Sequence, residues 1–366
     1  MPAIRKSLRY STLVSLLIIG VFLAACTSAK MAGDNKVTLS PVSHGIYHLE
    51  GLNAGEGLIW SPDGKYLAGL ILPILPMPDG CSPLPILCIL FPPSNDPPFS
   101  EIFLVRTDTW QRQTIIKIEY SQKRISSISW FPDSRHIIYD TTSYPNTGGV
   151  ISQLRSIGID GRNDVLFMND DKNHVWNLIW SPDGSKIASV GAIQESANWQ
   201  SVIYILNATN HEKDLIFEGK EQFSSVRSLS WSADGKKIAF SYGQIGSTIP
   251  AALRPQIFLS ALDTNKTTRL TNDQFEYWSG EFSPVHNLIA LQRVDATAAN
   301  SIPEYKTVIE DLDRYCQIEL PIADSNLASW SPDGQKLVVT SLYDAYLINL
   351  SEYIGPAFAE KGSICG

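Results

Sequence analysis

The hydrophobic residues of this chain fall into short runs separated by polar, turn-forming sequence. Short runs rich in Val, Ile, Leu and aromatic side chains are typical of β-strands, and beyond residue 25 no segment shows the period of an amphipathic helix. In one unit such runs lie at 178–180, 186–188 and 202–206, and other units end in a fourth run, as at 114–116 and 269–271. The pattern predicts an all-β protein built from units of four short strands.

A short phrase, Trp-Ser-Pro-Asp-Gly in its full form, stands between the first two strands of each unit. Its aromatic anchors are spaced 70, 50, 51, 51 and 48 residues apart, and a period near fifty is typical of propellers and solenoids. Ser, Pro, Asp and Gly in this order suit a type I turn with a Gly bulge, which would join the two strands as a hairpin. The anchor would then pack between adjacent sheets. The six copies begin at Trp60, Trp130, Trp180, Trp231, Phe282 and Trp330.

Four strands in each of six periods predict an all-β fold, a six-bladed β-propeller of four-stranded antiparallel blades. The last blade supplies three strands, at 326–330, 336–340 and 346–350, but no obvious fourth strand. We expect the N-terminal run 44–49 to complete this blade and close the ring, because closure removes an exposed sheet edge. The alternative is that residues 352–360 provide the strand and that the N-terminal run lies outside.

The repeats resemble the WD40-like repeats of the TolB-type β-propeller family. The resemblance rests on the Trp-Ser-Pro-Asp-Gly phrase, on the Ile-Ala-Phe-like strand after it and on the Ile-Tyr-like third strand, and it extends from about Val37 to the C-terminus. It implies the propeller fold and leaves the function open, because such repeats occur in scaffolds, peptidase regulatory domains and some lyases. Departures at Phe131, Ser134, Ala233 and in the fifth copy, which lacks Asp-Gly, concern the local turns.

Residues 1–25 have the composition of a signal peptide. Arg5, Lys6 and Arg9 form a positively charged start, and an apolar stretch from residue 13 to residue 25 follows. This order of charge, apolar segment and small residues is the one that an export signal requires. We therefore expect these residues to be absent from the folded domain.

The Leu-Ala-Ala before Cys26 resembles the bacterial lipobox. The resemblance implies that Cys26 becomes the lipidated N-terminus, that 26–37 is a tether and that 38–366 is the propeller. Diacylglycerol on that thiol supplies two acyl groups, about what stable anchoring needs. An ordinary cleaved signal and an uncleaved single-span anchor are the alternatives. The expected location is the cell membrane or outer membrane of a bacterium, facing the periplasm or the exterior.

The net charge of the chain is −8, and it is −11 without the three basic residues of the leader. A negative surface argues against nucleic acid or anionic lipid as the main partner. Four cysteines remain after Cys26, and an even number in an exported protein predicts disulfides with three possible pairings. Proximity favours Cys81 with Cys88, and neighbouring blades would allow Cys316 with Cys365. None of these cysteines has the spacing of metal ligands.

The first interval exceeds the others because of an insertion at about 72–99, between the second and third strands of blade 1. Its many prolines exclude a continuous helix or a central strand, and its apolar runs are too short to span a membrane. An exposed apolar loop of this kind usually marks a partner or membrane contact. The alternative is a loop folded onto the propeller face as local core.

The first strand of each blade should line the central channel, so residues four and six positions before the anchors should frame one mouth. Charges of both signs together with two indoles could hold a peptide or a sugar. The alternative is a mouth that is polar only because water fills it. The insertion would open on the same face. The candidate binding residues are Glu56, Arg124, His174, Trp176, Arg227, Glu276, Trp278 and Asp324.

Motifs for catalysis are missing from the sequence. It has no Gly-x-Ser-x-Gly and no phosphate loop, and His211-Glu212 lacks the second histidine of a zinc helix. Pectate-type lyases on a similar propeller use several channel histidines and a metal, whereas only His174 projects to the mouth here. We therefore predict no catalytic residue, no metal ligand and no cofactor.

The favoured function is a non-enzymatic, lipid-anchored propeller of the cell envelope that binds a protein or peptide through the mouth and the insertion. One alternative is a metal-assisted polysaccharide lyase or a glycan-binding propeller that acts in the channel. Another is a subunit of an envelope assembly whose insertion is buried at a permanent interface. A catalytic channel would need at least three converging His or carboxylate groups.

Overall fold

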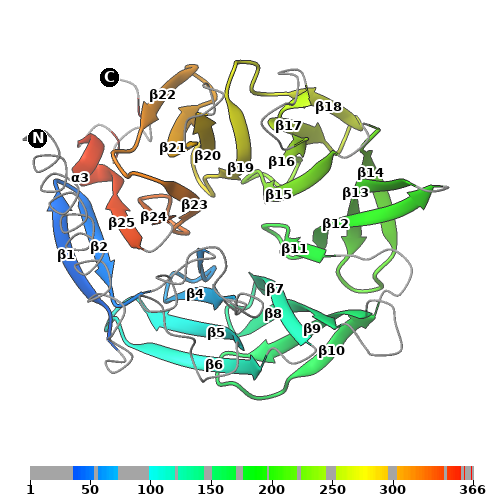
Figure 1. Ribbon diagram of the computed structural model, residues 1–366, viewed down its shortest axis with the longest axis horizontal. Helices are drawn as coiled ribbons and strands as arrows, with labels where there is room; N and C mark the ends of the chain where they lie inside the picture. Colours follow the sequence, from blue (N-terminus) through cyan, green and yellow to red (C-terminus); the bar gives the residue numbers. More distant parts are fainter. Residues whose placement is uncertain are drawn as a thin grey trace, which may run out of the picture.

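The six sheets of the protein stand around a central axis as the blades of a propeller (Figure 1). This computed structural model describes residues 36–52, 57–72, 99–119, 123–143, 151–169, 176–195, 198–220, 224–244, 253–295, 303–341 and 344–355, with Phe358 and Ile364. Each blade is antiparallel, and its first strand lies nearest the axis. The prediction of a six-bladed, all-β propeller is confirmed.

Five blades consist of four strands that follow one another in the chain. Blade 1 contains β3 (Leu58–Trp60), β4 (Tyr66–Ile71), β5 (Phe99–Arg106) and β6 (Arg112–Glu119). Blade 2 contains β7 (Lys123–Trp130), β8 (His136–Ser143), β9 (Ile151–Gly158) and β10 (Val165–Asn169). Blade 3 contains β11 (Trp176–Trp180), β12 (Lys186–Glu195), β13 (Asn198–Asn207) and β14 (Lys213–Glu218). Blade 4 contains β15 (Ser225–Trp231), β16 (Lys237–Gly243), β17 (Gln256–Ala261) and β18 (Lys266–Arg269). Blade 5 contains β19 (Glu276–Phe282), β20 (Leu288–Asp295), β21 (Glu304–Asp311) and β22 (Cys316–Glu319).

The sixth blade, here called the closing blade, combines both ends of the chain. Its strands from the axis outward are β23 (Ser325–Trp330), β24 (Lys336–Ser341), β25 (Ala345–Asn349), β2 (Ile46–Glu50) and β1 (Thr38–Ser43). Strand β2 pairs antiparallel with β25, so the prediction that the N-terminal run closes the ring is confirmed. The outermost strand, β1, was not predicted.

The alternative closure by residues 352–360 is wrong, because the chain after β25 turns into a short helix, α3 (Leu350–Ile354). This helix covers the tip of the N-terminal hairpin. Asn349 donates its N–H to the carbonyl of Gly45 at 2.7 Å, and the Tyr47 hydroxyl donates to Glu352 at 2.7 Å. Gly45 has φ +73°, and a Cβ there would lie 2.5 Å from the backbone nitrogen of Tyr353, so the contact requires glycine.

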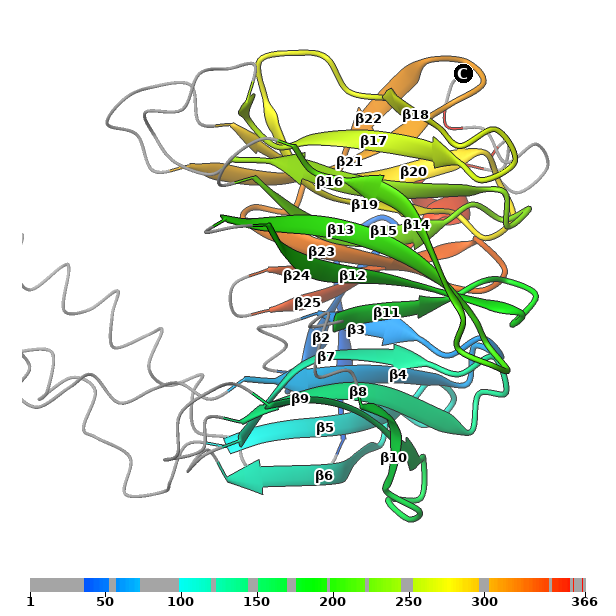
Figure 2. The ribbon, with the colours of Figure 1, turned by 90° about the vertical axis from the view of Figure 1, so that its right-hand side faces the viewer.

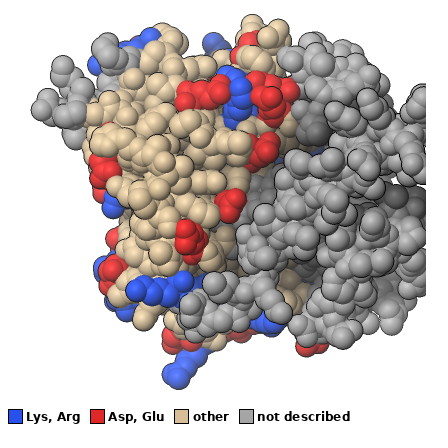
Figure 3. Space-filling model, turned by 60° about the vertical axis from the view of Figure 1, so that its left-hand side comes forward, with Lys and Arg blue, Asp and Glu red and all other residues tan. Residues whose placement is uncertain are grey.

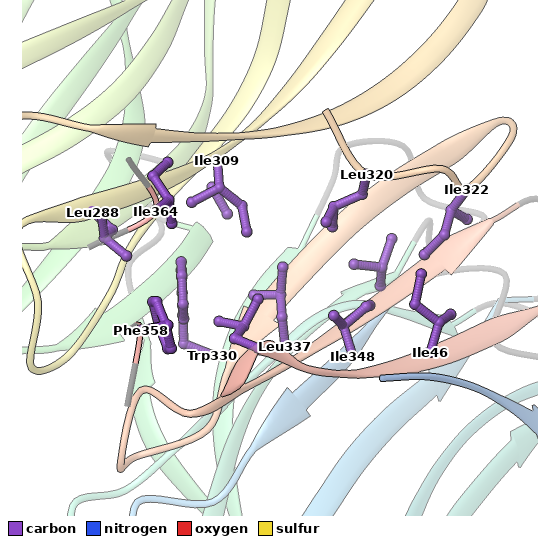
Figure 4. Packing of buried hydrophobic residues seen from close by; sticks show 13 residues of the cluster. Ile46, Leu288, Ile309, Leu320, Ile322, Trp330, Leu337, Ile348, Phe358 and Ile364 are labelled. Atoms are coloured by element: carbon purple, nitrogen blue, oxygen red, sulfur yellow. The ribbon is translucent and has the colours of Figure 1, made fainter. Parts of the chain in front are cut away.

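The core beneath this closure joins the closing blade to blade 5. Ile46 of β2, Ile348 of β25 and Leu337 of β24 pack in one cluster with the anchor Trp330, and all four are buried (Figure 4). Phe358 and Ile364, beyond α3, enter the same cluster from the C-terminal end. Burial of N-terminal and C-terminal residues in one core makes the closing blade dependent on both ends of the sequence.

The turn phrases form the hairpins that the sequence predicts. In blade 1 the Ser61 hydroxyl donates to Asp63, the Gly64 N–H donates to the Ser61 carbonyl, and Gly64 has φ +71°. Ser134 takes the glycine position in the second copy with φ 56° and the same backbone bond, from its N–H to the carbonyl of Phe131. The turn therefore survives the loss of glycine, although a side chain in this region is less favourable.

Anchor tryptophans bind the blades to one another. The indole N–H groups of Trp130 and Trp330 donate to the carbonyl of the preceding blade's residue just before its own anchor, at 3.2 and 3.0 Å. The indole nitrogens of Trp60 and Trp180 are buried without a hydrogen-bond partner. Trp60 also lines a cavity of about 280 Å³ between the closing blade and blade 1. The blade junctions are thus similar in packing but unequal in hydrogen bonding.

The surface beside the closing blade carries charges of both signs. Figure 3 shows acidic and basic side chains dispersed among wide uncharged areas, and on the coloured part of this face Lys and Arg do not gather into a broad patch. Within the described ranges, no helix is both long and apolar enough to cross a membrane.

Candidate functional site

The inner strands of blades 2 to 6 share a β-bulge near their N-terminal ends. In side view these ends lie on the side where β4 and β16 end and β5 and β17 begin (Figure 2). At a bulge, two residues or more face one residue of the partner strand, which bends the strand and redirects side chains. The register shifts lie between Ile125 and Ile128, Trp176 and Leu178, Val226 and Leu229, Tyr277 and Ser279, and Ser325 and Ala328.

Two of the predicted binding residues, Arg227 and Trp278, fall within these bulges. The sequence placed them four positions before their anchors, but it gave no sign of the bulges. An unpaired bulge residue does not need to follow the alternation of the strand, so its side chain is free to turn toward the mouth. The bulges therefore explain how neighbouring blades bring different residue types together.

A buried carboxylate supports the bulge of blade 2. Asp140, which is 4% exposed on β8, accepts hydrogen bonds from the N–H groups of Ser126 and Ser127 and from the Ser127 hydroxyl. Burial raises the pKa of Asp140, and the bonds from Ser127 and Ser126 oppose that rise. The Asp140 carboxylate is thus engaged in hydrogen bonds to the backbone, and its role at the mouth is structural.

The strongest convergence lies between blades 4 and 5. The Trp278 indole donates to the carboxylate of Glu276 at 3.1 Å, and Glu276 is 6% exposed. The guanidinium of Arg227, from blade 4, lies 5.8 Å from the centre of the Trp278 ring. Tyr305 meets the same ring edge-on, with centroids 5.5 Å apart. Three of the eight predicted residues are therefore in one group, here called the mouth cluster: Arg227, Glu276 and Trp278.

Sequence reasoning missed Tyr305 in this region, and it also missed Arg254. Its Nε lies 3.9 Å from a Glu276 oxygen, and its Nη1 donates to the carbonyl of Gln274 at 3.3 Å. The Arg254 Nε is buried and has no hydrogen-bond acceptor. Arg254 stands in the connection between β16 and β17, outside the repeat positions that were compared. The only available signal was its place in a loop of the same face.

Arg227 is exposed as a residue, but its guanidinium is partly buried beside blade 5. This partial burial lowers the pKa of the guanidinium, and the nearby carboxylate of Glu276 opposes that effect. The mouth cluster with Arg254 holds two guanidinium groups and one carboxylate. Two guanidinium groups against one carboxylate give this region an excess of positive charge inside a protein whose net charge is −8.

The remaining predicted mouth residues are not part of this group. Arg124 and Asp324 are exposed and belong to blades 2 and 6, and Asp324 has a left-handed backbone with φ 50°. Only the backbone of Trp176 is described, at the start of β11. Glu56 and His174, like Cys26, Cys81, Cys88 and Cys365, lie outside the described residues.

Three of the residues that precede an anchor, Ser230, Glu281 and Ser329, accept a hydrogen bond from the backbone N–H of the next blade's anchor. The Ser230 hydroxyl accepts the N–H of Phe282 at 2.9 Å, and the Glu281 carboxylate accepts the N–H of Trp330 at 3.3 Å. Burial raises the pKa of Glu281 to about 7, against the lowering effect of its hydrogen bonds. Glu281 thus places a titratable group where another blade uses serine.

Across the described ranges of the chain, His, Cys, Asp and Glu nowhere form a group of three or more that could hold a metal ion. The described part of the mouth instead offers guanidinium groups, an indole and a phenol. These groups bind ligands by charge, hydrogen bonding and stacking.

No protein-family model and no curated protein sequence matches the chain. Among solved structures, an oligogalacturonate lyase in complex with manganese has a TM-score of 0.51 at 11% identity, over 87% of this chain and 97% of its own. The tricorn protease has a TM-score of 0.50 at 9% identity, over 87% of this chain and 32% of its own. TolB from Acinetobacter baumannii has a TM-score of 0.49 at 19% identity, over 68% of this chain and 59% of its own. At these identities the likeness to the lyase and to the tricorn protease shows the propeller fold and nothing more.

Proposed function

We propose that this protein is a non-enzymatic, lipid-anchored propeller of the bacterial cell envelope that binds a protein or peptide through its channel mouth. The observation that carries the proposal is the convergence of Arg227, Glu276 and Trp278 from two blades at one rim. An indole, a phenol and charged groups of both signs at one rim suit a peptide, because rings supply contact area and charges orient the peptide backbone. The TolB-like repeats agree with a binding scaffold.

The Pro-rich insertion would extend this binding face. Strand β4 ends at Ile71 and β5 begins at Phe99, and Leu70 pairs with Ile102, so the insertion leaves the blade between its second and third strands. The β16–β17 connection, which carries Arg254, occupies the corresponding place in blade 4. Both connections therefore open toward the same end of the channel, and one partner could contact both.

Anchoring through Cys26 fits the contacts that Lys36 and Val37 make with blade 1. Lys36 forms a bridge with Gln111, and the Val37 N–H donates to the Trp110 carbonyl at 2.7 Å. Val37 is 2% exposed, so the chain is fixed to the propeller rim ten residues or so after Cys26. The segment between would be a short tether, of roughly 30 Å if fully extended.

Disulfides are part of the same proposal for an exported protein. Ile364 is buried in the cluster against which Cys316 packs, so the segment next to Cys365 returns to the region of Cys316. This neighbourhood supports a Cys316–Cys365 bond, and Cys81 with Cys88 would then form the second. Peptide mapping without reduction distinguishes these pairs from the other two pairings.

The test of binding compares envelope proteins captured by the acylated wild type and by Trp278→Ala. Trp278 is at the rim, so its loss should leave folding intact and reduce partner recovery several-fold. Replacement of residues 72–99 by a short Gly-Asn turn should do the same. Partner recovery unchanged by both variants would overturn the proposed binding face.

Anchoring is tested separately with Cys26→Ser. Only a thiol accepts the diacylglycerol, so the variant should lose radiolabelled palmitate and fail to mature. Equal labelling of variant and wild type would disprove lipidation at Cys26.

A further inference from the structure

We propose that the channel mouth captures one carboxylate group of its partner between the guanidinium groups of Arg227 and Arg254. The inference rests on the proposed binding function and specifies its chemistry. A carboxylate from the C-terminus of a peptide and one from an Asp or Glu side chain share this chemistry, and the experiment below separates the two sources.

The first argument is the charge of the region. Arg227 and Arg254 carry two positive charges, and among the described residues around them the carboxylate in contact is that of Glu276. One oxygen of Glu276 accepts the Trp278 indole N–H, and the other lies 3.9 Å from Arg254 Nε. At 3.9 Å an ion pair persists but no hydrogen bond forms. One ligand carboxylate would balance the charge.

The second argument concerns Arg227. No described residue accepts a hydrogen bond from its guanidinium, which lies 5.8 Å from the Trp278 ring centre, and the residue as a whole is exposed. Contact with a ring orients the guanidinium plane but leaves its N–H donors unused. Arginine binds a carboxylate through two parallel hydrogen bonds when its fork is held in place. Arg227 is therefore oriented and available.

The third argument concerns Arg254, whose side chain is 23% exposed. Its Nη1 is held by the Gln274 carbonyl at 3.3 Å, while its buried Nε has no acceptor. A buried donor without a partner is unfavourable. The arrangement is thus incomplete, and a ligand carboxylate that accepts a hydrogen bond from this Nε–H would complete it.

The apolar side of the site sets which carboxylates fit. Trp278 is flanked by Tyr305, so the carbon atoms next to a bound carboxylate would lie against two rings. Small inorganic anions lack such carbon atoms and should bind more weakly than a peptide. The expected ligand is therefore a peptide that carries one carboxylate with apolar carbon atoms next to it.

The experiment uses the mature protein and three acetylated tripeptides. The first is Ac-Ala-Ala-Ala with a free carboxylate, the second is Ac-Ala-Asp-Ala-amide, and the third is Ac-Ala-Ala-Ala-amide. The readout is the Nε–H resonance of Arg227 and of Arg254 by nuclear magnetic resonance, assigned with Arg→Gln variants. We expect saturable shifts with one or both carboxylate peptides and none with the neutral amide.

Variants test which side chains carry the effect. Arg227→Gln and Arg254→Gln should each weaken binding at least tenfold, since each removes a charge-assisted hydrogen bond. Arg227→Lys keeps the charge but not the two parallel N–H donors, so its affinity should lie between those of the wild type and Arg227→Gln. Arg135→Gln is the matched control, because Arg135 is exposed on a turn at the other end of blade 2. Rising salt should weaken the binding.

The outcomes separate this inference from the proposed function. A response to the free terminus alone assigns a C-terminal carboxylate, and a response to the Asp peptide alone assigns a side chain. An equal response to the neutral amide, or full binding by both Arg→Gln variants, overturns the carboxylate site. If partner capture depends on Trp278 but not on either arginine, the binding function stands and only the carboxylate inference fails.

Discussion

The indole nitrogen of Trp231 lies 3.2 Å from the carbonyl oxygen of Ile179 on the preceding blade and donates a hydrogen bond to it. Trp130 and Trp330 make the same bond across their junctions, whereas the buried nitrogens of Trp60 and Trp180 make none. The repeats therefore contain anchor tryptophans with and without an indole hydrogen bond. Single substitutions can measure how much this bond contributes to stability.

Trp231→Phe should destabilise the protein by about 1 kcal/mol more than Trp60→Phe. Both changes remove similar ring area, but only the first removes a hydrogen bond and leaves the Ile179 carbonyl without its donor. Urea unfolding of the two variants measures the difference. Equal losses would mean that the indole bonds contribute nothing to the blade junctions.

Glu281→Gln should raise stability at high pH. Glu281 has its pKa raised from 4.5 to about 7, so the folded protein holds this proton more tightly than the unfolded protein does. The stability that this proton contributes is complete below pH 4.5 and is lost as pH rises through about 7. Glutamine keeps an acceptor for Trp330 without the charge, so the advantage of the variant over wild type should grow by roughly 2–3 kcal/mol from about pH 5 to about pH 8.

Urea unfolding of both proteins at a series of pH values provides the measurement. A difference that does not change with pH would show that Glu281 titrates normally and that the channel is wetter at this level than its burial indicates.

Asp140→Ala should destabilise the protein by roughly 2–3 kcal/mol, because it leaves the bulge N–H of Ser127 without an acceptor inside the blade. Asp140→Asn keeps one acceptor oxygen and should lose less. The control is Asp263→Ala, an exposed position in a turn, which should change the free energy of unfolding by less than about 0.5 kcal/mol. If Asp140→Ala lowers the free energy of unfolding only slightly, Asp140 does not stabilise the bulge.

Ile46→Ala should cost roughly 2–4 kcal/mol, because Ile46 is 1% exposed in the core that joins both ends of the chain. Val42→Ala on the outermost strand should be almost neutral, since Val42 is 58% exposed. Thermal or chemical unfolding measures both. A neutral Ile46→Ala would mean that closure through β2 adds little to the stability of the ring.

The blades could be predicted because each hairpin is local. The turn at Ser61 and the anchor at Trp60 fix two adjacent strands within a few residues, and the period repeats them. The outer strand β1 was missed because Pro41 interrupts its pattern, and proline is acceptable only at such an edge.

The mouth was predicted only in part, because its contacts are between blades and are not local in the sequence. Counting back from the anchors located Arg227 and Trp278, but their contact depends on bulges and on the fit between two blades. Arg254 enters from a connection whose sequence has no repeat position. Contacts between blades follow from tertiary packing, which a repeat pattern along the sequence does not describe.

Closure through β2 and β25 also decides when the molecule can finish folding. His48 of β2 meets Asp344 across 296 residues of sequence, so β2 cannot pair with β25 until almost the whole propeller has been synthesised. Until then the unclosed protein is an open row of blades with an unpaired strand edge at each end, and such edges promote aggregation. A product that ends before Ala345 keeps those edges for good. Only copies that contain both β2 and β25 can therefore close the ring.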